Sequence, residues 1–369
     1  MRRAWIVILA AFGLLGGVAW LVFRPAAPQP VAYGQPLDYW LNKVAARTGP
    51  LSYRYPRTTN APTDEHTYQE ALAAIGPKAV PFILRKLGTN DSPLRNWYRQ
   101  KATNLPAWIV NRVGKPGTIT FDTRSAYDAI TRLDTNHSAV LPVMLGLVNS
   151  GNPAFREVAV QYVSYNFQPI LSTNRALGVF RRAARDNDPA VRLYGIQALG
   201  NLGSAASNAL PELIDSLSAN EAGRHAERSE RWYVRTWAAK TLGSIGPGAA
   251  VALPALTNLA LTGDGYQRTG ACKAIWQITS NLDFVLPHLL ADLPKLGDSE
   301  KPSAIEGIGE IGPGAISAVP VLLKEYEQAN SLRRSPKNYY PEEILRYITN
   351  ALERIDPDAL KQLEAGHAR

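Results

Sequence analysis

The sequence predicts an all-α protein, an α-solenoid of stacked helix pairs that follows one apolar helix at the N-terminus. Three observations support this fold class: a run of twenty uncharged residues near the start, a turn that recurs along the body, and a spacing between turns that is often about 33 residues. A unit that recurs at this period is typical of solenoid proteins, in which each unit buries its apolar face against its neighbours.

The composition is that of an ordered protein with a large core. Of the 369 residues, 46% are hydrophobic and 19% are charged, which excludes a disordered chain. The formal net charge of +9 favours acidic partners or anionic surfaces. The single cysteine, Cys272, rules out intrachain disulfides and cysteine-based zinc fingers. The five histidines show no metal-ligand spacing, so we expect neither a metal site nor a cofactor.

Residues 1–24 are expected to be an N-terminal membrane anchor or a signal peptide. The apolar run from Ala4 to Phe23 is long enough, as a helix, to cross a bilayer. Two arginines precede the run, and residues 25–42 hold no Lys or Arg, so the positive-inside bias places the body outside the cytoplasm, on the periplasmic side. The alternative is a chain secreted after cleavage near Ala19, where small residues follow a shorter apolar region.

The rest of the chain divides into three expected parts. Residues 25–36 form a Pro-rich spacer, which the three prolines just after the apolar run make stiff and extended. Residues 37–66 form an N-terminal capping helix and a loop. Residues 67–365 form the solenoid, with about eight helix pairs, one of them degenerate around residues 162–167. Polar or irregular stretches predict insertions near 97–123, 220–231 and 330–341.

Each repeat has the same local sequence pattern. An apolar first helix ends in small residues and a Gly-containing turn, and the second helix then carries an early proline. Glycine favours the left-handed conformation that ends a helix, and proline suits the first turn of the next one. Other helices begin with Asn152-Pro153 or Asp188-Pro189, an N-cap followed by a first-turn proline. We expect the arginines four residues after these caps, Arg156 and Arg192, to bridge to the neighbouring unit's cap.

The turn at residues 188–192, with the pattern Asp-x-x-Val-Arg, and the Ala-Leu-Gly-x-Leu/Ile-Gly endings resemble HEAT repeats. They are most similar to the bacterial HEAT-like subgroup, also called phycocyanobilin-lyase-like repeats. The resemblance covers roughly residues 68–360 and speaks for architecture rather than chemistry. It implies a right-handed superhelix whose second helices line a concave, partner-binding face.

The motifs that could carry chemistry have simpler structural interpretations. Residues 307–312 match Gly-x-Gly-x-x-Gly, but they end a repeat's first helix, whereas a dinucleotide fingerprint lies between a strand and a helix. Cys272 replaces small core residues of other units and is expected to be a buried, inert thiol. His288 is expected at the surface or in a groove, without a catalytic companion. We therefore expect no catalytic, cofactor-binding or metal-binding residues.

The first insertion is the candidate partner-binding site. Between Arg95 and Arg124 the chain holds six basic residues and one acidic residue, interleaved with aromatic side chains. Such a mixture can bind acidic protein segments, anionic glycans or nucleic acid. The alternative is an insertion that packs its aromatic residues on the solenoid and leaves its charges solvated. The residues expected to contact a partner are Arg95, Trp97, Tyr98, Arg99, Lys101, Trp108 and Arg112.

These expectations describe a non-enzymatic scaffold for protein–protein interaction, tethered to the membrane and displayed outside the cytoplasm. Its partner would be a protein, possibly an acidic one, recognised through a large preshaped surface. Nucleic acid is not an expected partner, because the export segment removes the body from the cytoplasm. The alternative is a HEAT-like accessory enzyme, lyase-like or nucleic-acid-acting, that uses the concave groove, since bilin lyases and HEAT-like DNA glycosylases contain such repeats.

Overall fold

The computed structural model confirms the all-α fold class. Helices make up 84% of the residues that the structure describes. The chain forms two compact units, Met1–Val140 and Leu141–Arg369, which are described separately below. The described residues are 28–48, 64–89, 121–134, 137–167, 171–218, 228–332 and 340–367.

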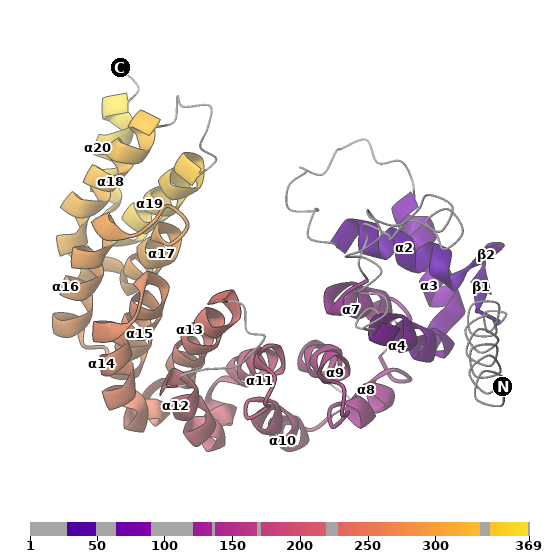
Figure 1. The fold of residues 1–369 in the computed structure, drawn as a ribbon. Helices are drawn as coiled ribbons and strands as arrows, with labels where there is room; N and C mark the ends of the chain where they lie inside the picture. Colours follow the sequence, from indigo (N-terminus) through magenta and orange to yellow (C-terminus); the bar gives the residue numbers. More distant parts are fainter. Residues whose placement is uncertain are drawn as a thin grey trace, which may run out of the picture. The chain divides into compact units, whose positions relative to one another are not determined.

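The first unit contains a small hairpin and several helices (Figure 1). Tyr33 and Gly34 both have positive φ, 50° and 72°, as a two-residue hairpin turn requires. The end of the expected spacer, residues 31–36, is therefore paired rather than simply extended. The elements are β1 (Val31–Ala32), β2 (Gln35–Pro36), α2 (Leu37–Thr48), α3 (Asp64–Ile75), η2 (Gly76–Ala79), α4 (Val80–Thr89) and α7 (Thr123–Thr131).

Polar contacts join the helices of this first unit. On α2, the Asp38 carboxylate lies 2.8 Å from the Lys86 ammonium of α4, and the backbone N–H of Asp38 donates to Gln29. Burial alone would raise the pKa of Asp38, but hydrogen bonds from Lys86 and Gln29 outweigh it and lower that pKa below its ordinary value. The Tyr68 hydroxyl of α3 donates to Asp128 of α7 at 3.2 Å.

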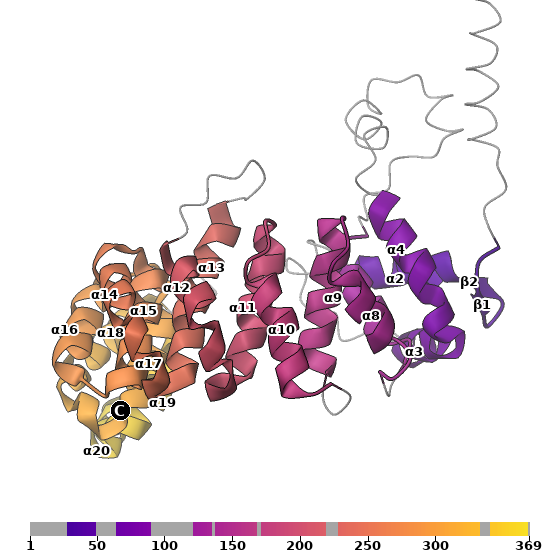
Figure 2. The ribbon, with the colours of Figure 1, turned by 90° about the horizontal axis from the view of Figure 1, so that it is seen from below.

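The second unit is a succession of helix pairs (Figures 1 and 2). Counted along the sequence, the described helices from α9 to α20 fall into six consecutive pairs, and α9 with α10 spans the region that was expected to be degenerate. The elements are α8 (Leu141–Leu147), α9 (Pro153–Asn166), α10 (Thr173–Ala183), α11 (Pro189–Asn201), η4 (Gly203–Ala209), α12 (Leu210–Ser218), α13 (Arg228–Ile245), η5 (Gly246–Ala252), α14 (Leu253–Thr262), α15 (Gly265–Thr279), α16 (Leu282–Asp292), η6 (Leu293–Lys295), α17 (Lys301–Ile311), η7 (Gly312–Ala318), α18 (Val319–Leu332), α19 (Tyr340–Ile355) and α20 (Pro357–His367).

The glycine turns adopt the conformation that the sequence predicts. Gly76, Gly203, Gly246 and Gly312 have φ values of 66°, 54°, 77° and 68°. Each opens a short 3₁₀ stretch that leads directly into the second helix of its pair. The positive φ is readily accessible only to glycine, which explains why these turns punctuate the repeat.

Helices occupy the edges of the expected insertions. Helix α13 begins at Arg228 and α18 ends at Leu332, so both helices extend into stretches that were expected to be irregular. At the end of the first insertion, Phe121 is buried and Asp122 caps α7 by accepting from the backbone N–H of Ser125. The rest of that insertion lies outside the described residues.

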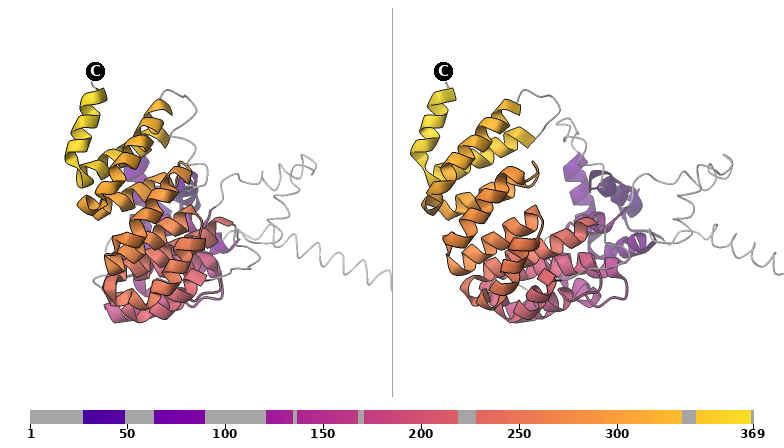
Figure 3. Two further views of the ribbon diagram at one scale, coloured as in Figure 1. Left: turned by 90° about the vertical axis from the view of Figure 1, so that its left-hand side faces the viewer. Right: turned by 60° about the vertical axis from the view of Figure 1, so that its left-hand side comes forward.

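The curvature of the second unit reverses one expectation. Figure 1 shows α11, α13, α15, α17 and α19 on the inner side of the curve and the second helices on its outer side, and Figure 3 gives two further views. Most successive first helices pack extensively, with α15 and α17 as the exception, whereas successive second helices touch much less. Small residues allow this approach: a Cβ added at Gly243 or Gly309 would lie 3.0 Å from Ala274 Cα or Ala351 Cα on the next first helix. The first helices, not the second, line the concave face.

The expected membrane helix, residues 1–24, lies outside the described residues. Among the described residues, the stretch Tyr233–Thr262 is long and apolar enough to cross a membrane, with a mean hydropathy of 1.3. That stretch is not one straight helix, because Gly246 has a positive φ and Ala249 is non-helical. It consists of most of α13, then η5 and α14, and therefore forms a repeat unit of the solenoid.

Candidate functional site

An open hollow of about 630 Å³ lies beside α10 in the second unit. Its charged lining comes from α9, α10, α12 and the loop that joins α10 to α11. Four guanidinium groups and two carboxylates line it, so its charge is positive. We call it the arginine hollow, and its charged residues are Arg156, Arg181, Arg182, Arg185, Asp186 and Glu212.

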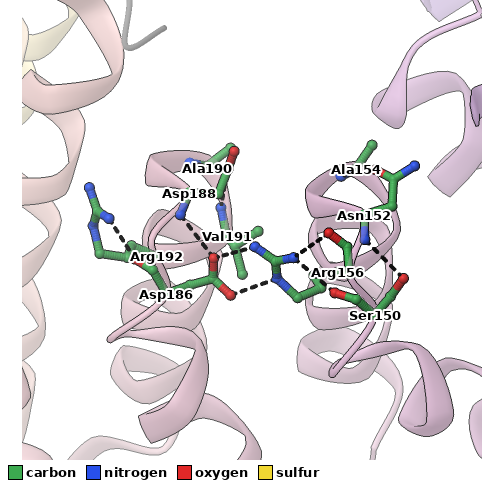
Figure 4. A network of polar contacts seen from close by, with 10 residues as sticks. Ser150, Asn152, Ala154, Arg156, Asp186, Asp188, Ala190, Val191 and Arg192 are labelled. Atoms are coloured by element: carbon green, nitrogen blue, oxygen red, sulfur yellow. Dashed lines mark hydrogen bonds and ion pairs between the residues drawn. The ribbon is translucent and has the colours of Figure 1, made fainter. Parts of the chain in front are cut away.

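One wall of the arginine hollow is a two-pronged ion pair between Arg156 of α9 and Asp186 (Figure 4). Both nitrogen–oxygen distances are 2.7 Å, and a third guanidinium nitrogen donates to the carbonyl oxygen of Ser150 at 2.8 Å. The hydrogen bonds to Asp186 raise the pKa of Arg156. Both side chains are largely buried, so the pair fixes the start of α9 against the loop before α11.

The N-caps at this wall are those that the sequence predicts. The side chain of Asn152 accepts from a backbone N–H at the start of α9, and that of Asp188 accepts from two at the start of α11. Arg156 does bridge to the next unit, but its partner is Asp186, two residues before the cap, and not the cap Asp188 itself. Arg192 behaves differently, because it donates back to the carbonyl oxygen of Asp186 at 2.5 Å.

The same bridge recurs further along the chain. Asp264 caps α15, and Arg268, four residues later, donates to Asp292 at 2.6 Å and to the carbonyl oxygen of Gly263 at 2.8 Å. The recurrence marks the arginine-to-aspartate bridge as part of the repeat. The Arg156–Asp186 wall is therefore structural, and specificity of the hollow must come from its other arginines.

The floor of the arginine hollow is the buried carboxylate of Glu212 on α12. Its Oε1 accepts from Arg181 Nε at 2.8 Å and lies 3.3 Å from a terminal nitrogen of Arg185. Its Oε2 is buried without a hydrogen-bond partner among the protein atoms. Because an unpaired buried carboxylate is costly, Glu212 restrains both arginines and holds them over the hollow.

The rim carries guanidinium donors that remain available to a ligand. Arg182 uses one nitrogen on Asn149 at 2.7 Å, and Arg185 is 60% exposed. A guanidinium has five N–H groups in a planar fork that matches carboxylate or phosphate oxygens. Since the lining carboxylates are already held by arginines, the arrangement is suited to binding an anion.

The residues singled out in the sequence are mostly structural where the structure describes them. Cys272 is buried on α15, as expected, and burial raises its pKa to about 12. Gly307 and Gly309 lie inside α17 and Gly312 ends it, so the glycine motif is not a nucleotide loop. The half-buried His288 ring nitrogen contacts the carbonyl oxygen of Phe284 at 2.6 Å. In the part of the chain that the structure describes, no three His, Cys, Asp or Glu residues are placed to hold a metal ion.

The expected partner-binding residues, Arg95 to Arg112, all lie outside the described residues. The arginine hollow was not anticipated. Its signal is present in the sequence as four arginines without an acid between residues 173 and 185. The contribution of Glu212 carries no such signal, because it comes from a different unit.

Comparisons with known proteins do not identify a family for this chain. No family model matches the chain, and no curated protein matches it. Among solved structures, an engineered protein aligns at 17% identity and a TM-score of 0.36, over 87% of this chain and 77% of the other. Kap121p aligns at 12% identity and a TM-score of 0.29, over 89% of this chain and 47% of the other. Scores this low carry no argument, and the repeated helix pairs themselves define the chain as a helical-repeat solenoid.

Proposed function

We propose that this protein is a non-enzymatic scaffold for protein–protein interaction, of the HEAT-like class, anchored in a membrane by residues 1–24. Its solenoid is displayed outside the cytoplasm and binds an acidic protein partner. The anchor and its orientation rest on the sequence, through the length of the apolar run and the position of the flanking arginines. Binding rests on the fold, because a solenoid offers an extended surface along its stacked units.

The observation that carries the proposal is the use of charged side chains to join neighbouring helices. Lys273 of α15 pairs with Glu310 of α17 at 2.7 Å. Lys301 of α17 pairs with Glu325 of α18, and both side chains are buried. Together with the arginine-to-aspartate bridges, these pairs fix neighbouring helices against one another, so the surface that the helices display is formed before a partner binds. Recognition by a preformed surface avoids the entropy of ordering a site on binding.

The first insertion contributes to this binding in the proposal. Its arginines would meet acidic groups, so affinity should fall steeply with added salt, since exposed charge pairs are screened over about 8–10 Å at physiological ionic strength. Its tryptophans, Trp97 and Trp108, would act as anchors that matter more for affinity than for salt dependence.

The proposed membrane anchoring and orientation can be tested with the full chain in a bacterial host. We expect it to stay in the membrane after alkaline carbonate washing and its body to be digested by protease added to spheroplasts. A cytoplasmic marker protein should survive the same protease. A protected body would contradict the orientation, and a mature chain that starts at Trp20 would establish the secreted alternative.

The partner can be tested by affinity capture from detergent-solubilised membranes, followed by salt elution. Serine substitution of Arg95, Arg99, Lys101 and Arg112 together should reduce recovery of a salt-eluted acidic protein. The matched control replaces four exposed lysines, Lys78, Lys240, Lys295 and Lys324, with serine and should leave recovery unchanged. Equal recovery with both variants would remove the first insertion from the binding surface.

A further inference from the structure

Helix α10 concentrates positive charge on one exposed side. Arg175 and Arg182 are exposed and lie seven residues apart on α10, which places them on the same face of the helix. Arg185, also exposed, follows in the turn just after the helix ends at Ala183. The helix dipole favours arginine in the last turn, where Arg181 and Arg182 lie. It disfavours arginine in the first turn, where Arg175 lies. The dipole therefore explains only part of the cluster.

Gly178 lies between these arginines and lines the arginine hollow. A glycine in the middle of a helix costs about 0.5–1 kcal/mol relative to alanine. Packing does not require it, because a Cβ added there would have no atom within 4 Å. Where a residue departs from local preference without a structural cause, function is the usual reason. Here the missing side chain leaves the helix backbone open to a close approach.

The arginines are held in place before any ligand arrives. Glu212 restrains Arg181 and Arg185, and Asn149 restrains Arg182. Restrained guanidinium groups lose little rotational freedom on binding. Their charge is not cancelled, because the lining contains twice as many guanidinium groups as carboxylates.

We propose that the arginine hollow docks an acidic segment of a partner protein, which lies along α10 across Gly178. Its carboxylates pair with Arg182 and Arg185 at the rim. The inference deepens the proposed function by giving the scaffold a second docking site. Charge complementarity and shape select this occupant: a hollow of this volume is within the range of ligand pockets, and a bare glycine admits a peptide backbone, whereas a membrane surface would meet only the rim.

The experiment uses the full chain in neutral detergent and two fluorescein-labelled decapeptides, one of alternating Glu and Gly and one of alternating Gln and Gly. We expect fluorescence anisotropy to detect binding of the Glu peptide only, weakening as salt is added. The double variant R182A/R185A should weaken binding about tenfold or more, because it removes charge-assisted hydrogen bonds. The double variant K295A/K324A removes the same charge from other exposed sites and should leave binding unchanged.

Substitution of Gly178 separates docking at the hollow from general attraction to a basic protein. G178E fills the hollow and adds a negative charge, so it should abolish peptide binding, whereas G178A adds only a methyl group against the peptide backbone and should weaken binding by less. Circular dichroism should show that both variants keep their helices. Equal loss in R182A/R185A and K295A/K324A, or full binding by G178E, would overturn the proposal. So would binding of the wild-type chain to phosphatidylglycerol vesicles but not to the Glu peptide.

Failure of this inference is distinguishable from failure of the proposed function. If R182A/R185A lowers neither peptide binding nor capture of the salt-eluted acidic partner, the arginine hollow is not a docking site while the scaffold stands. If the peptide binds as expected but no partner is recovered from membranes, the hollow keeps its ligand class and the scaffold proposal fails.

Discussion

Two glycines on neighbouring helices should respond in opposite ways to the same substitution. Gly178 on α10 has open space around a new Cβ, so G178A should stabilise the protein by about 0.5–1 kcal/mol through helix propensity alone. Gly195 on α11 faces the end of α10, where a new Cβ would lie 2.5 Å from Ala184 N and 2.8 Å from Ala183 Cβ. Backbone atoms cannot give way as a flexible side chain can, so the two helices must separate.

The net effect of G195A on stability is the difference between the cost of overpacking and the gain in helix propensity. Overpacking costs about 1–3 kcal/mol, and a clash with backbone atoms at 2.5 Å places Gly195 in the upper part of this range, about 2–3 kcal/mol. The gain in helix propensity returns about 1 kcal/mol. G195A should therefore destabilise the protein by roughly 1–2 kcal/mol, and the two variants should differ by about 2 kcal/mol. Urea unfolding followed by far-ultraviolet circular dichroism measures this difference. The reasoning is refuted if G195A unfolds at the wild-type urea concentration, or if both substitutions shift the midpoint in the same direction.

Three further predictions follow from the turns, the thiol and one ion pair. G246V should lower the free energy of unfolding by about 1–2 kcal/mol or more, because the φ of Gly246 is 77°. G248A lies in the same turn but has no positive φ, so it should change the urea midpoint little. Equal effects of the two variants would contradict this reasoning. Cys272, with a pKa of about 12, should react with iodoacetamide at pH 8 only after denaturation, so rapid labelling of the native protein would show an accessible thiol. The pKa of Asp38 is lowered from 3.8, so its contribution to stability is present above that pH and is lost as pH falls through the lower folded value. K86M should reduce the loss of stability at acid pH when unfolding is measured as a function of pH. An unchanged slope of stability against pH would exclude Lys86 as the cause.

The repeat could be predicted because its determinants are local. Gly203, Gly246 and Gly312 each stand where a helix must end in a left-handed residue, so the residue type itself reports the backbone conformation. Asp188 followed by proline reports the start of α11 in the same way. These signals require only a few adjacent residues, and the helix pairs follow from them.

The arginine hollow could not be predicted because its floor is not local. Arg181 and Glu212 are separated by 31 residues, and an adjacent unit could have placed any of several side chains beneath α10. Burial of Glu212 depends on how closely α12 packs, which no pattern within α12 records. The expectation that second helices line the concave face had the same weakness, since curvature depends on the spacing between helices.

The close contacts at Gly243 and Gly309 have a consequence for how wide the second unit opens. They lie on the inner side of the curve, while the outer helices are about 8–10 Å away. Widening one inner contact by a few tenths of an ångström would therefore rotate one unit against the next by roughly 2–3°. A rotation at one contact displaces all the helix pairs that follow it along the solenoid. A single methyl group added at residue 243 or 309 would therefore move the far end of the second unit by more than it moves the adjacent helix pair. Single small residues thus set the breadth of the arc that a partner must fit.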